Sequence, residues 1–240
     1  MLATHNFPTT FRKTHALRHL LQAGLLASAI TALANDPVTV PTLNPDSYDH
    51  PVKIACLGDS ITQGVGTHDP ATESYPAQLQ TLLGTKYVVT NFGVGGRTLL
   101  RKQDPFDIGR ALRSKPDVVV IMLGTNDSRQ QTLDQHGADF IGDYDHIIEQ
   151  FKALETHPKI WICAPVPMFP GQWKLSEELL SSKVIPAIQQ VAKDENVPII
   201  DLHTPFLNEK SNFPDTVHPN PKAAHHIAEC VATALAGTRQ

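Results

Sequence analysis

The sequence predicts an α/β fold, a flavodoxin-like three-layer α/β/α sandwich around a five-stranded parallel sheet. From Pro51 onward, short apolar runs alternate with stretches of helical periodicity, as repeated strand–helix units require. Residues 118–123 (VVVIML) are continuously apolar, which is expected of a central parallel strand covered by helices on both faces. The 240 residues are enough for one domain with a well-buried core.

The individual elements follow from these patterns. Ser74 is placed to cap the first helix, and Pro76 falls in its first turn, where a missing N–H costs little. Pro186 lies inside the fourth helix, which should therefore be kinked or split. The predicted strands are 52–57, 87–92, 117–123, 159–164 and 197–202, and the predicted helices are 75–83, 106–114, 140–154, 176–195 and 221–236.

The first 34 residues have the pattern of a secretory signal peptide. Three Lys/Arg residues precede an apolar run at 20–34, which ends in a small-x-small site and is too short to span a bilayer comfortably. We expect cleavage after Ala34 and a secreted or periplasmic protein; an ordinary amphipathic N-terminal helix is the alternative. Residues 35–50, rich in Pro, Asn and Asp, are expected to form an extended leader, and residues 51–240 the domain.

The charge and the cysteine content of the chain argue against several classes of function. Removal of the first 34 residues takes away three Lys/Arg and no acid, so the formal charge changes from −4 to −7. An acidic surface opposes binding to nucleic acid and to anionic membranes. An odd number of cysteines without a CxxC pair predicts neither a disulfide framework nor a metal site, so Cys56, Cys163 and Cys230 are expected to be free thiols. No HExxH or other spaced ligand set occurs, and we expect no metal and no other cofactor.

Four short blocks fall where chemistry is expected, because parallel sheets of this kind bind ligands at the carboxyl ends of their strands. Residues 58–60 (GDS) follow the first strand and put a serine on a tight turn. Residues 91–96 (NFGVGG) follow the second strand, and their glycines let backbone N–H groups approach a ligand closely. Residues 124–127 (GTND) follow the third strand, and residues 215–218 (DTVH) precede the last helix. Each block alone is a weak signal, whereas the four in this order are a strong one.

Together these blocks resemble those of the SGNH hydrolases, also called GDSL esterases, over nearly the whole chain after the leader. The resemblance implies that Ser60 is the nucleophile and that Asp215 and His218 complete a catalytic triad. It also implies an oxyanion hole formed by the backbone N–H groups of Ser60 and Gly96 and by the side-chain amide of Asn126.

Two positions depart from the family's pattern. Ile61 replaces leucine in the first block, which is a conservative change. Arg97 stands where some relatives carry aspartate. This exchange alters the charge of the cleft, so Arg97 is a candidate substrate contact.

The residue types explain the expected chemistry. A serine hydroxyl is a poor nucleophile until an adjacent base takes its proton. His218 suits that task because imidazole titrates near neutral pH. Asp215 would hold the imidazole in the correct tautomer, and a spacing of three residues lets one turn bring both side chains together.

Structural interpretations stay open beside the functional ones. Ser60 could be only a helix N-cap, and Asn126 could merely brace a turn. Asp59 and Asp127 are expected to be structural carboxylates that bond to the backbone of their loops.

The predicted substrate is a small-molecule or glycan ester. Residues 164–173 follow the fourth strand and should border the active site, where Trp173 could stack on a sugar ring or simply pack. Within the family, the sequence resembles secreted bacterial carbohydrate O-acetylesterases, including sialate O-acetylesterase-like proteins, and the platelet-activating-factor acetylhydrolase branch. This resemblance implies a short acyl group. The alternatives are a lysophospholipase or thioesterase for longer chains, and a catalytically silent glycan-binding protein.

Overall fold

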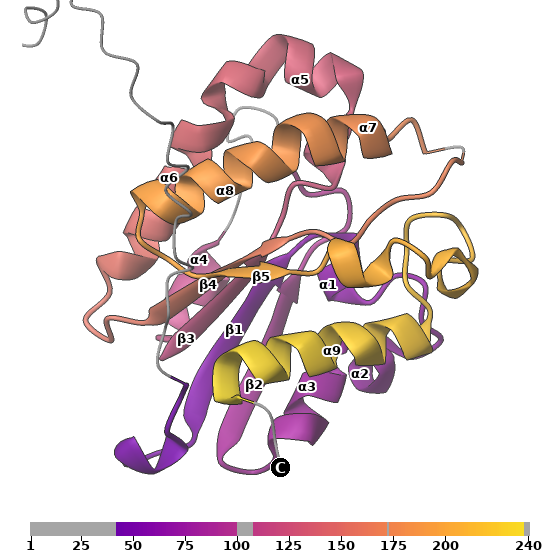
Figure 1. The fold of residues 1–240 in the computed structure, drawn as a ribbon. Helices are drawn as coiled ribbons and strands as arrows, with labels where there is room; N and C mark the ends of the chain where they lie inside the picture. Colours follow the sequence, from indigo (N-terminus) through magenta and orange to yellow (C-terminus); the bar gives the residue numbers. More distant parts are fainter. Residues whose placement is uncertain (1–41, 100–107, 172, 238–240) are drawn as a thin grey trace, which may run out of the picture. The chain divides into compact units, whose positions relative to one another are not determined.

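The computed structural model describes residues 42–99, 108–171 and 173–237 (Figure 1). The predicted signal peptide and the first part of the predicted leader lie outside these ranges. None of the described helices combines the length and hydropathy needed to cross a membrane.

A single parallel sheet organises the described chain, and the predicted fold class is confirmed. Its five strands lie in the order β2-β1-β3-β4-β5, so β1 and β3 occupy the centre. β5 is shorter than predicted and pairs with β4 over three residues. Pro198 comes directly before it and has no N–H to donate, so the strand starts after this proline. The strands are β1 (Val52–Gly58), β2 (Tyr87–Gly93), β3 (Val118–Met122), β4 (Lys159–Ala164) and β5 (Ile199–Asp201).

The central strand β3 is buried along its whole length. Val118 and Val120 pack in the core on one face of the sheet, and Val119 and Ile121 pack in the core on the other. This arrangement explains the continuous apolar run in the sequence, because both faces of the strand meet helices.

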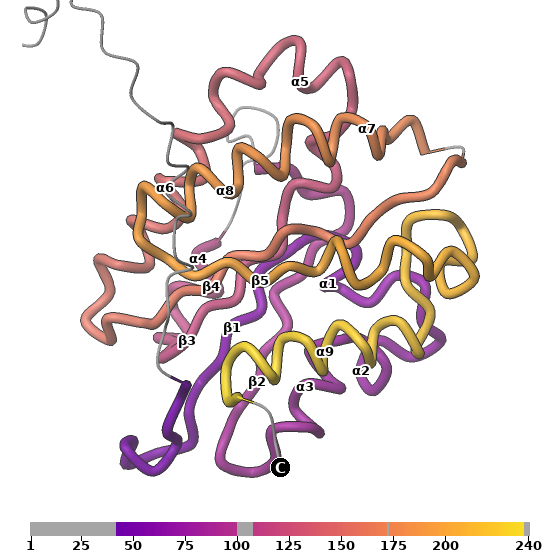
Figure 2. Tube along the Cα trace, viewed as in Figure 1, coloured from indigo at the N-terminus to yellow at the C-terminus, as the bar shows by residue number. Residues whose placement is uncertain are grey.

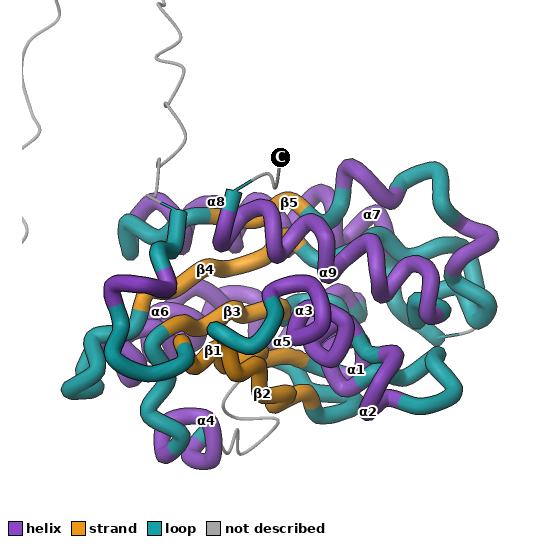
Figure 3. Tube along the Cα trace, turned by 90° about the horizontal axis from the view of Figure 1, so that it is seen from below, coloured by secondary structure: helices purple, strands orange, loops and turns teal. Residues whose placement is uncertain are grey.

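Helices cover both faces of the sheet, as Figures 1 and 3 show. On one face the core includes side chains of α3 and α9, and on the other those of α4, α6 and α8. The helices are α1 (Ser60–Gln63), α2 (Pro70–Glu73), α3 (Tyr75–Leu83), α4 (Gly109–Arg113), α5 (Gln130–His136), α6 (Phe140–Lys152), α7 (Glu177–Leu179), α8 (Ile185–Asp194) and α9 (Pro221–Ala236).

The helix that contains Pro186 is continuous rather than split. Its hydrogen bonding changes to a π-helical turn at Leu180–Val184, where the N–H of Ile185 bonds to the carbonyl of Leu180. Proline cannot donate to the carbonyl four residues earlier, and a wider turn directly before it accommodates this loss. α4 and α6 end one and two residues before their predicted limits, and the start of the predicted helix 106–114 lies partly outside the described residues.

The described part of the predicted leader packs on the domain. The side chain of Leu43 is buried in the core beside α9, and its backbone N–H donates to the carbonyl of Leu235 at 2.7 Å. A short 3-10 helix follows at Pro45–Ser47, and Asp46 within it pairs with Lys86.

The register of the sheet brings the ends of three strands together. Gly58, the last residue of β1, pairs with Gly93 of β2 and with Met122 of β3. The loops that follow these strands therefore start side by side, and they carry three of the four blocks singled out in the sequence.

We predict that Gly93→Ala strongly destabilises the protein. An added Cβ would lie 2.1 Å from the backbone nitrogen of Gln63, at the end of α1, so the backbone would have to move. The expected loss is about 3 kcal/mol in the free energy of unfolding, measured by urea denaturation. Gly142→Ala is the control, because its Cβ would meet no atom within 4 Å in the first turn of α6. That variant should gain about 1 kcal/mol; equal stabilities of the two variants would contradict the prediction.

Candidate active site

A chain of hydrogen bonds joins the serine of the first block to the acid and base of the last. The Oγ atom of Ser60 lies 2.8 Å from Nε2 of His218, and Nδ1 of His218 lies 2.6 Å from Oδ2 of Asp215. His218 is buried, and Ser60 is half-buried at the start of α1. Figure 2 shows how the segment leading into α9 returns to the side of α1. The structure thus brings together residues that are 158 positions apart.

Asp215 fixes the conformation of its own turn. Its Oδ1 accepts hydrogen bonds from the backbone N–H groups of Val217 at 3.0 Å and His218 at 2.7 Å. Partial burial raises the pKa of Asp215, but the hydrogen bonds from the His218 ring and from these N–H groups outweigh that effect and lower the pKa. The ionised carboxylate therefore holds the proton of His218 on Nδ1 and leaves Nε2 to accept the hydroxyl of Ser60.

The loop after β2 adjoins the serine and carries the predicted oxyanion donor Gly96. Gly96 has a φ of 77°, in the left-handed region that favours glycine, and its N–H meets no acceptor among the described residues. The neighbouring Gly95 N–H is already used, since it donates to Oε1 of Gln63 at 2.8 Å. A Cβ built on Gly95 would lie 3.9 Å from Cβ of Ser60, so this loop adjoins the hydroxyl.

Asn126 is held in one orientation by an arginine that the sequence analysis did not single out. Nη2 of Arg129 donates to Oδ1 of Asn126 at 3.3 Å, and Nη1 donates to the Asn126 carbonyl at 3.1 Å. The amide nitrogen faces the other way and donates one hydrogen to the carbonyl of Arg97 at 3.0 Å. Its second hydrogen remains available. No motif marked Arg129, because its effect depends on a long side chain folding back over its own loop.

Two buried carboxylates support these loops, as the sequence analysis expected. Oδ1 of Asp59 caps α1 by accepting the N–H of Ile61 at 2.9 Å. Both oxygens of Asp127 accept the N–H of Leu99, at 3.0 and 3.2 Å. Burial raises the pKa of Asp59 to about 6 and that of Asp127 to about 7, and the charge of Asp59 contributes to the second shift.

Arg97 does not occupy the position expected of a substrate contact. Its side chain is buried and donates from Nη1 to the carbonyl of Phe92 at 3.0 Å, at the end of β2. A bonded, buried guanidinium at this place braces the strand end. The position of Arg97 in the sequence does not show in which direction so long a side chain points.

Trp173 lies directly on the acid–base turn. Its indole N–H donates to the carbonyl of Asp215 at 3.0 Å, and its ring stands nearly perpendicular to that of His218, with centroids 5.4 Å apart. Trp173 is 42% exposed, so it also borders solvent at the site.

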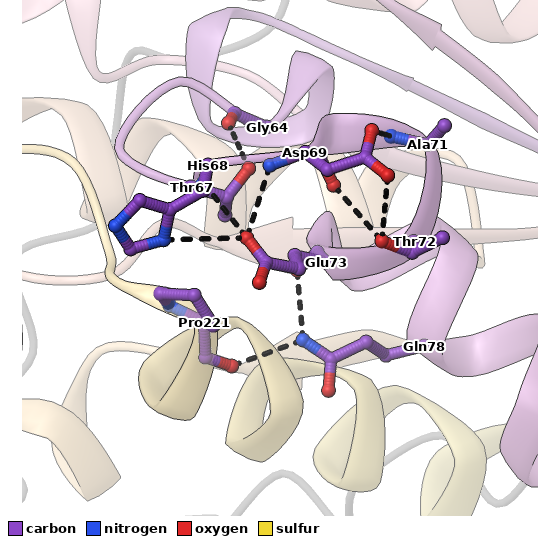
Figure 4. Close-up of polar contacts among 9 residues, drawn as sticks. All are labelled: Gly64, Thr67, His68, Asp69, Ala71, Thr72, Glu73, Gln78 and Pro221. Carbon is purple, nitrogen blue, oxygen red and sulfur yellow. Dashed lines mark hydrogen bonds and ion pairs between the residues drawn. The ribbon is translucent and has the colours of Figure 1, made fainter.

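The loop between α1 and α2 closes against the backbone of His218. Gly66, with a φ of 97°, leaves no room for a side chain, because a Cβ would lie 2.7 Å from the carbonyl oxygen of Pro219. Figure 4 shows the polar contacts that hold this region. The carboxylate of Glu73 accepts the N–H of His68 at 2.7 Å, and Nε2 of Gln78 bridges the carbonyls of Glu73 and Pro221. The sequence analysis did not identify this loop as part of the site.

Among the described residues, two features bear on metal and thiol chemistry. No group of three or more His, Cys, Asp or Glu side chains there could hold a metal ion. The three cysteines are free, as expected, and burial raises the pKa of Cys56 to about 12. A thiol with so high a pKa is unreactive.

Comparison with known proteins identifies the family. Residues 56–225 match the model of the GDSL-like lipase/acylhydrolase family. The chain belongs to this family. It is also 38% identical to an acetylxylan esterase of Xylanibacter ruminicola over 214 residues, a match that covers 80% of this chain and 44% of that protein. The chain therefore spans less than half the length of this relative.

Solved structures of other proteins share the fold. The acetyl xylan esterase AlAXEase is 26% identical, with a TM-score of 0.58, and the match covers 77% of this chain and 100% of that one. A lipase/acylhydrolase from Enterococcus faecalis is 20% identical, with a TM-score of 0.63, over 79% of this chain and 100% of that one.

The buried Asp127 predicts a pH dependence of stability. Because its pKa in the folded protein, about 7, exceeds the ordinary value of 3.8, protonated Asp127 favours folding, and this contribution is lost as pH rises toward 7. The Asp127→Asn variant has no group at this position that titrates. Between pH 5 and pH 8, its free energy of unfolding should therefore fall by about 2–3 kcal/mol less than that of the unaltered protein. Urea denaturation at both pH values measures this difference. Glu178→Gln removes an exposed carboxylate and is the control; parallel pH profiles for Asp127→Asn and the unaltered protein would refute the prediction.

Proposed function

We propose that this protein is a serine carboxylic ester hydrolase that removes acetyl groups from a carbohydrate. The observation that carries the proposal is the uninterrupted hydrogen-bond chain from Ser60 through His218 to Asp215. A buried imidazole placed between a hydroxyl and an ionised carboxylate is the arrangement that activates serine for acyl transfer.

The proposed reaction begins with attack of Ser60 Oγ on the ester carbonyl. The hydroxyl proton passes to Nε2 of His218, while Asp215 stabilises the imidazolium that forms. The N–H groups of Ser60 and Gly96 and the amide of Asn126 donate to the oxyanion. His218 then gives its proton to the leaving sugar oxygen, and the acyl group remains on Ser60. Water activated by the same imidazole releases acetate.

The acetyl-carbohydrate substrate is supported by two kinds of observation. The relative from Xylanibacter ruminicola is an acetylxylan esterase, and so is AlAXEase. Trp173 is exposed and contacts His218, so an aromatic side chain stands at the edge of the site. An aromatic side chain at such a place can also contact a sugar ring.

Export of the protein is part of the same proposal. A polymer such as acetylated xylan lies outside the cell, and an N-terminal signal peptide of 34 residues would deliver the enzyme there. N-terminal sequencing of the exported protein tests this point: residue 35 should be the first residue found.

We predict that Ser60→Ala lowers acetate release by about 10³-fold or more, because the variant lacks the nucleophile. Acetate release is measured on acetylated xylan, acetylated chitin fragments, O-acetyl sialic acid and simple acetyl sugars. Ser47→Ala, an exposed serine in the N-terminal segment, is the control and should retain full activity. Equal hydrolysis by Ser60→Ala and the unaltered protein would rule out Ser60 as the nucleophile. No acetate release by the unaltered protein would favour a silent glycan-binding protein.

The acyl group is tested with p-nitrophenyl esters of increasing length. The acetyl ester should turn over faster than the octanoyl ester. The opposite order would favour a lysophospholipase or thioesterase.

The oxyanion role of Asn126 gives a graded prediction. Asn126→Ala should reduce kcat about 10²-fold, as loss of one oxyanion donor does. Arg129→Ala leaves the donor in place but frees its orientation, so kcat should fall about tenfold, a smaller loss that follows from weaker preorganisation. Arg113→Ala removes an exposed arginine on α4 and serves as the control. If Arg129→Ala and Arg113→Ala hydrolyse p-nitrophenyl acetate equally well, Arg129 does not orient Asn126 for catalysis.

A further inference from the structure

We propose that Trp173 is a positioning residue, which holds the Asp215–His218 turn at the correct distance from Ser60. The proposal rests on the proposed function of these three residues. It assigns Trp173 a role in the chemical step itself, in addition to any contact with a sugar.

The turn that carries the acid and the base contains a strained residue. Thr216, between them, has a φ of 75°, which is the left-handed region that a β-branched residue very rarely adopts. Such a conformation persists only where the surroundings enforce it, and it often marks a functional site. Contacts around Thr216 must therefore hold it.

The segment after β4 provides those contacts. The N–H of Phe169 donates to the carbonyl of Thr216 at 2.9 Å. Gly171 lies directly against the Thr216 side chain, because a Cβ at position 171 would come within 2.0 Å of Thr216 Oγ1. On its other side, the N–H of Thr216 bonds to the carbonyl of Phe213 at 2.9 Å.

Trp173 contacts the same turn from the solvent side. We call the contacts of Phe169, Gly171 and Trp173 with this turn the clamp. The indole N–H of Trp173 bonds to the carbonyl of Asp215, and its ring meets the imidazole of His218, so one side chain contacts both ends of the turn. Because Trp173 is 42% exposed, core packing alone does not account for its position.

Kinetics on a substrate without sugar separate positioning from sugar stacking. With p-nitrophenyl acetate, Trp173→Ala should lower kcat at least tenfold and leave KM within twofold. Trp173→Phe keeps a ring beside His218 but loses the N–H donor, so it should recover part of the lost kcat. Val88→Ala, an exposed apolar residue on β2, is the control and should match the unaltered enzyme. Unchanged kcat for Trp173→Ala on p-nitrophenyl acetate, with a raised KM only on acetylated xylo-oligosaccharides, would overturn the proposal and leave Trp173 as a sugar contact.

A second pair of variants tests the clamp without changing Trp173. Gly171→Ala should reduce kcat because the new methyl group pushes on Thr216. The double variant Gly171→Ala/Thr216→Gly removes the clashing side chain and should be more active than Gly171→Ala alone. A double variant with no higher activity than Gly171→Ala would contradict the proposed clamp.

Labelling with a fluorophosphonate makes the test independent of the natural substrate. Ser60 Oγ forms a bond to phosphorus, fluoride leaves, and the hydroxyl proton passes to His218. Mass spectrometry should find Ser60 labelled at least tenfold more slowly in Trp173→Ala than in the unaltered protein. If the unaltered protein is labelled but releases no acetate from any carbohydrate, the substrate proposal fails while the positioning proposal is still decided by the two labelling rates. Equal rates, or no labelling of Ser60 at all, would overturn the positioning proposal.

Discussion

Parallel pairing of β1 with both β2 and β3 is the constraint on which the site depends. Gly58 is in register with Gly93 and Met122, so the three loops that follow these strands start side by side at the carboxyl edge of the sheet. Ser60, Gly96 and Asn126 sit on these loops, within a few residues of the strand ends. A shift of register by one residue would turn every strand residue to the opposite face and separate these loops. The buried apolar faces of β1 and β3 therefore fix the geometry of the polar site.

The loops of the site are joined to one another by side chains rather than by the sheet. Asn126 and Asp127 bond to the backbone of residues 97 and 99, which ties the loop after β3 to the loop after β2. Gln63 does the same between α1 and Gly95. These bonds place the donors of the candidate oxyanion hole before any substrate arrives, which is the condition for effective electrostatic stabilisation.

Sequence patterns were sufficient for the fold and for the meeting of Ser60 with His218. Strand and helix periodicity is set by burial, and three of the four blocks stand at strand ends. The partnership of Ser60 with Asp215 and His218 was implied by the resemblance to the SGNH hydrolases. The directions in which long side chains point could not be predicted from the sequence. Arg97 turns inward to the end of β2, and Arg129 turns back over Asn126, and no local sequence pattern encodes either direction. Trp173 was expected near the site, but its bond to Asp215 depends on a turn whose strain the sequence does not reveal.

The contact between Leu43 and Leu235 has a consequence for modular architecture. It brings the two ends of the described domain together beside the end of α9, whereas Ser60 lies at the opposite, carboxyl end of the strands. Additional modules fused before residue 43 or after residue 235 would therefore be attached to the described domain at the end opposite Ser60. Such modules would be attached away from the candidate active site, so a further module can be gained or lost in evolution, or grafted by engineering, without redesign of that site.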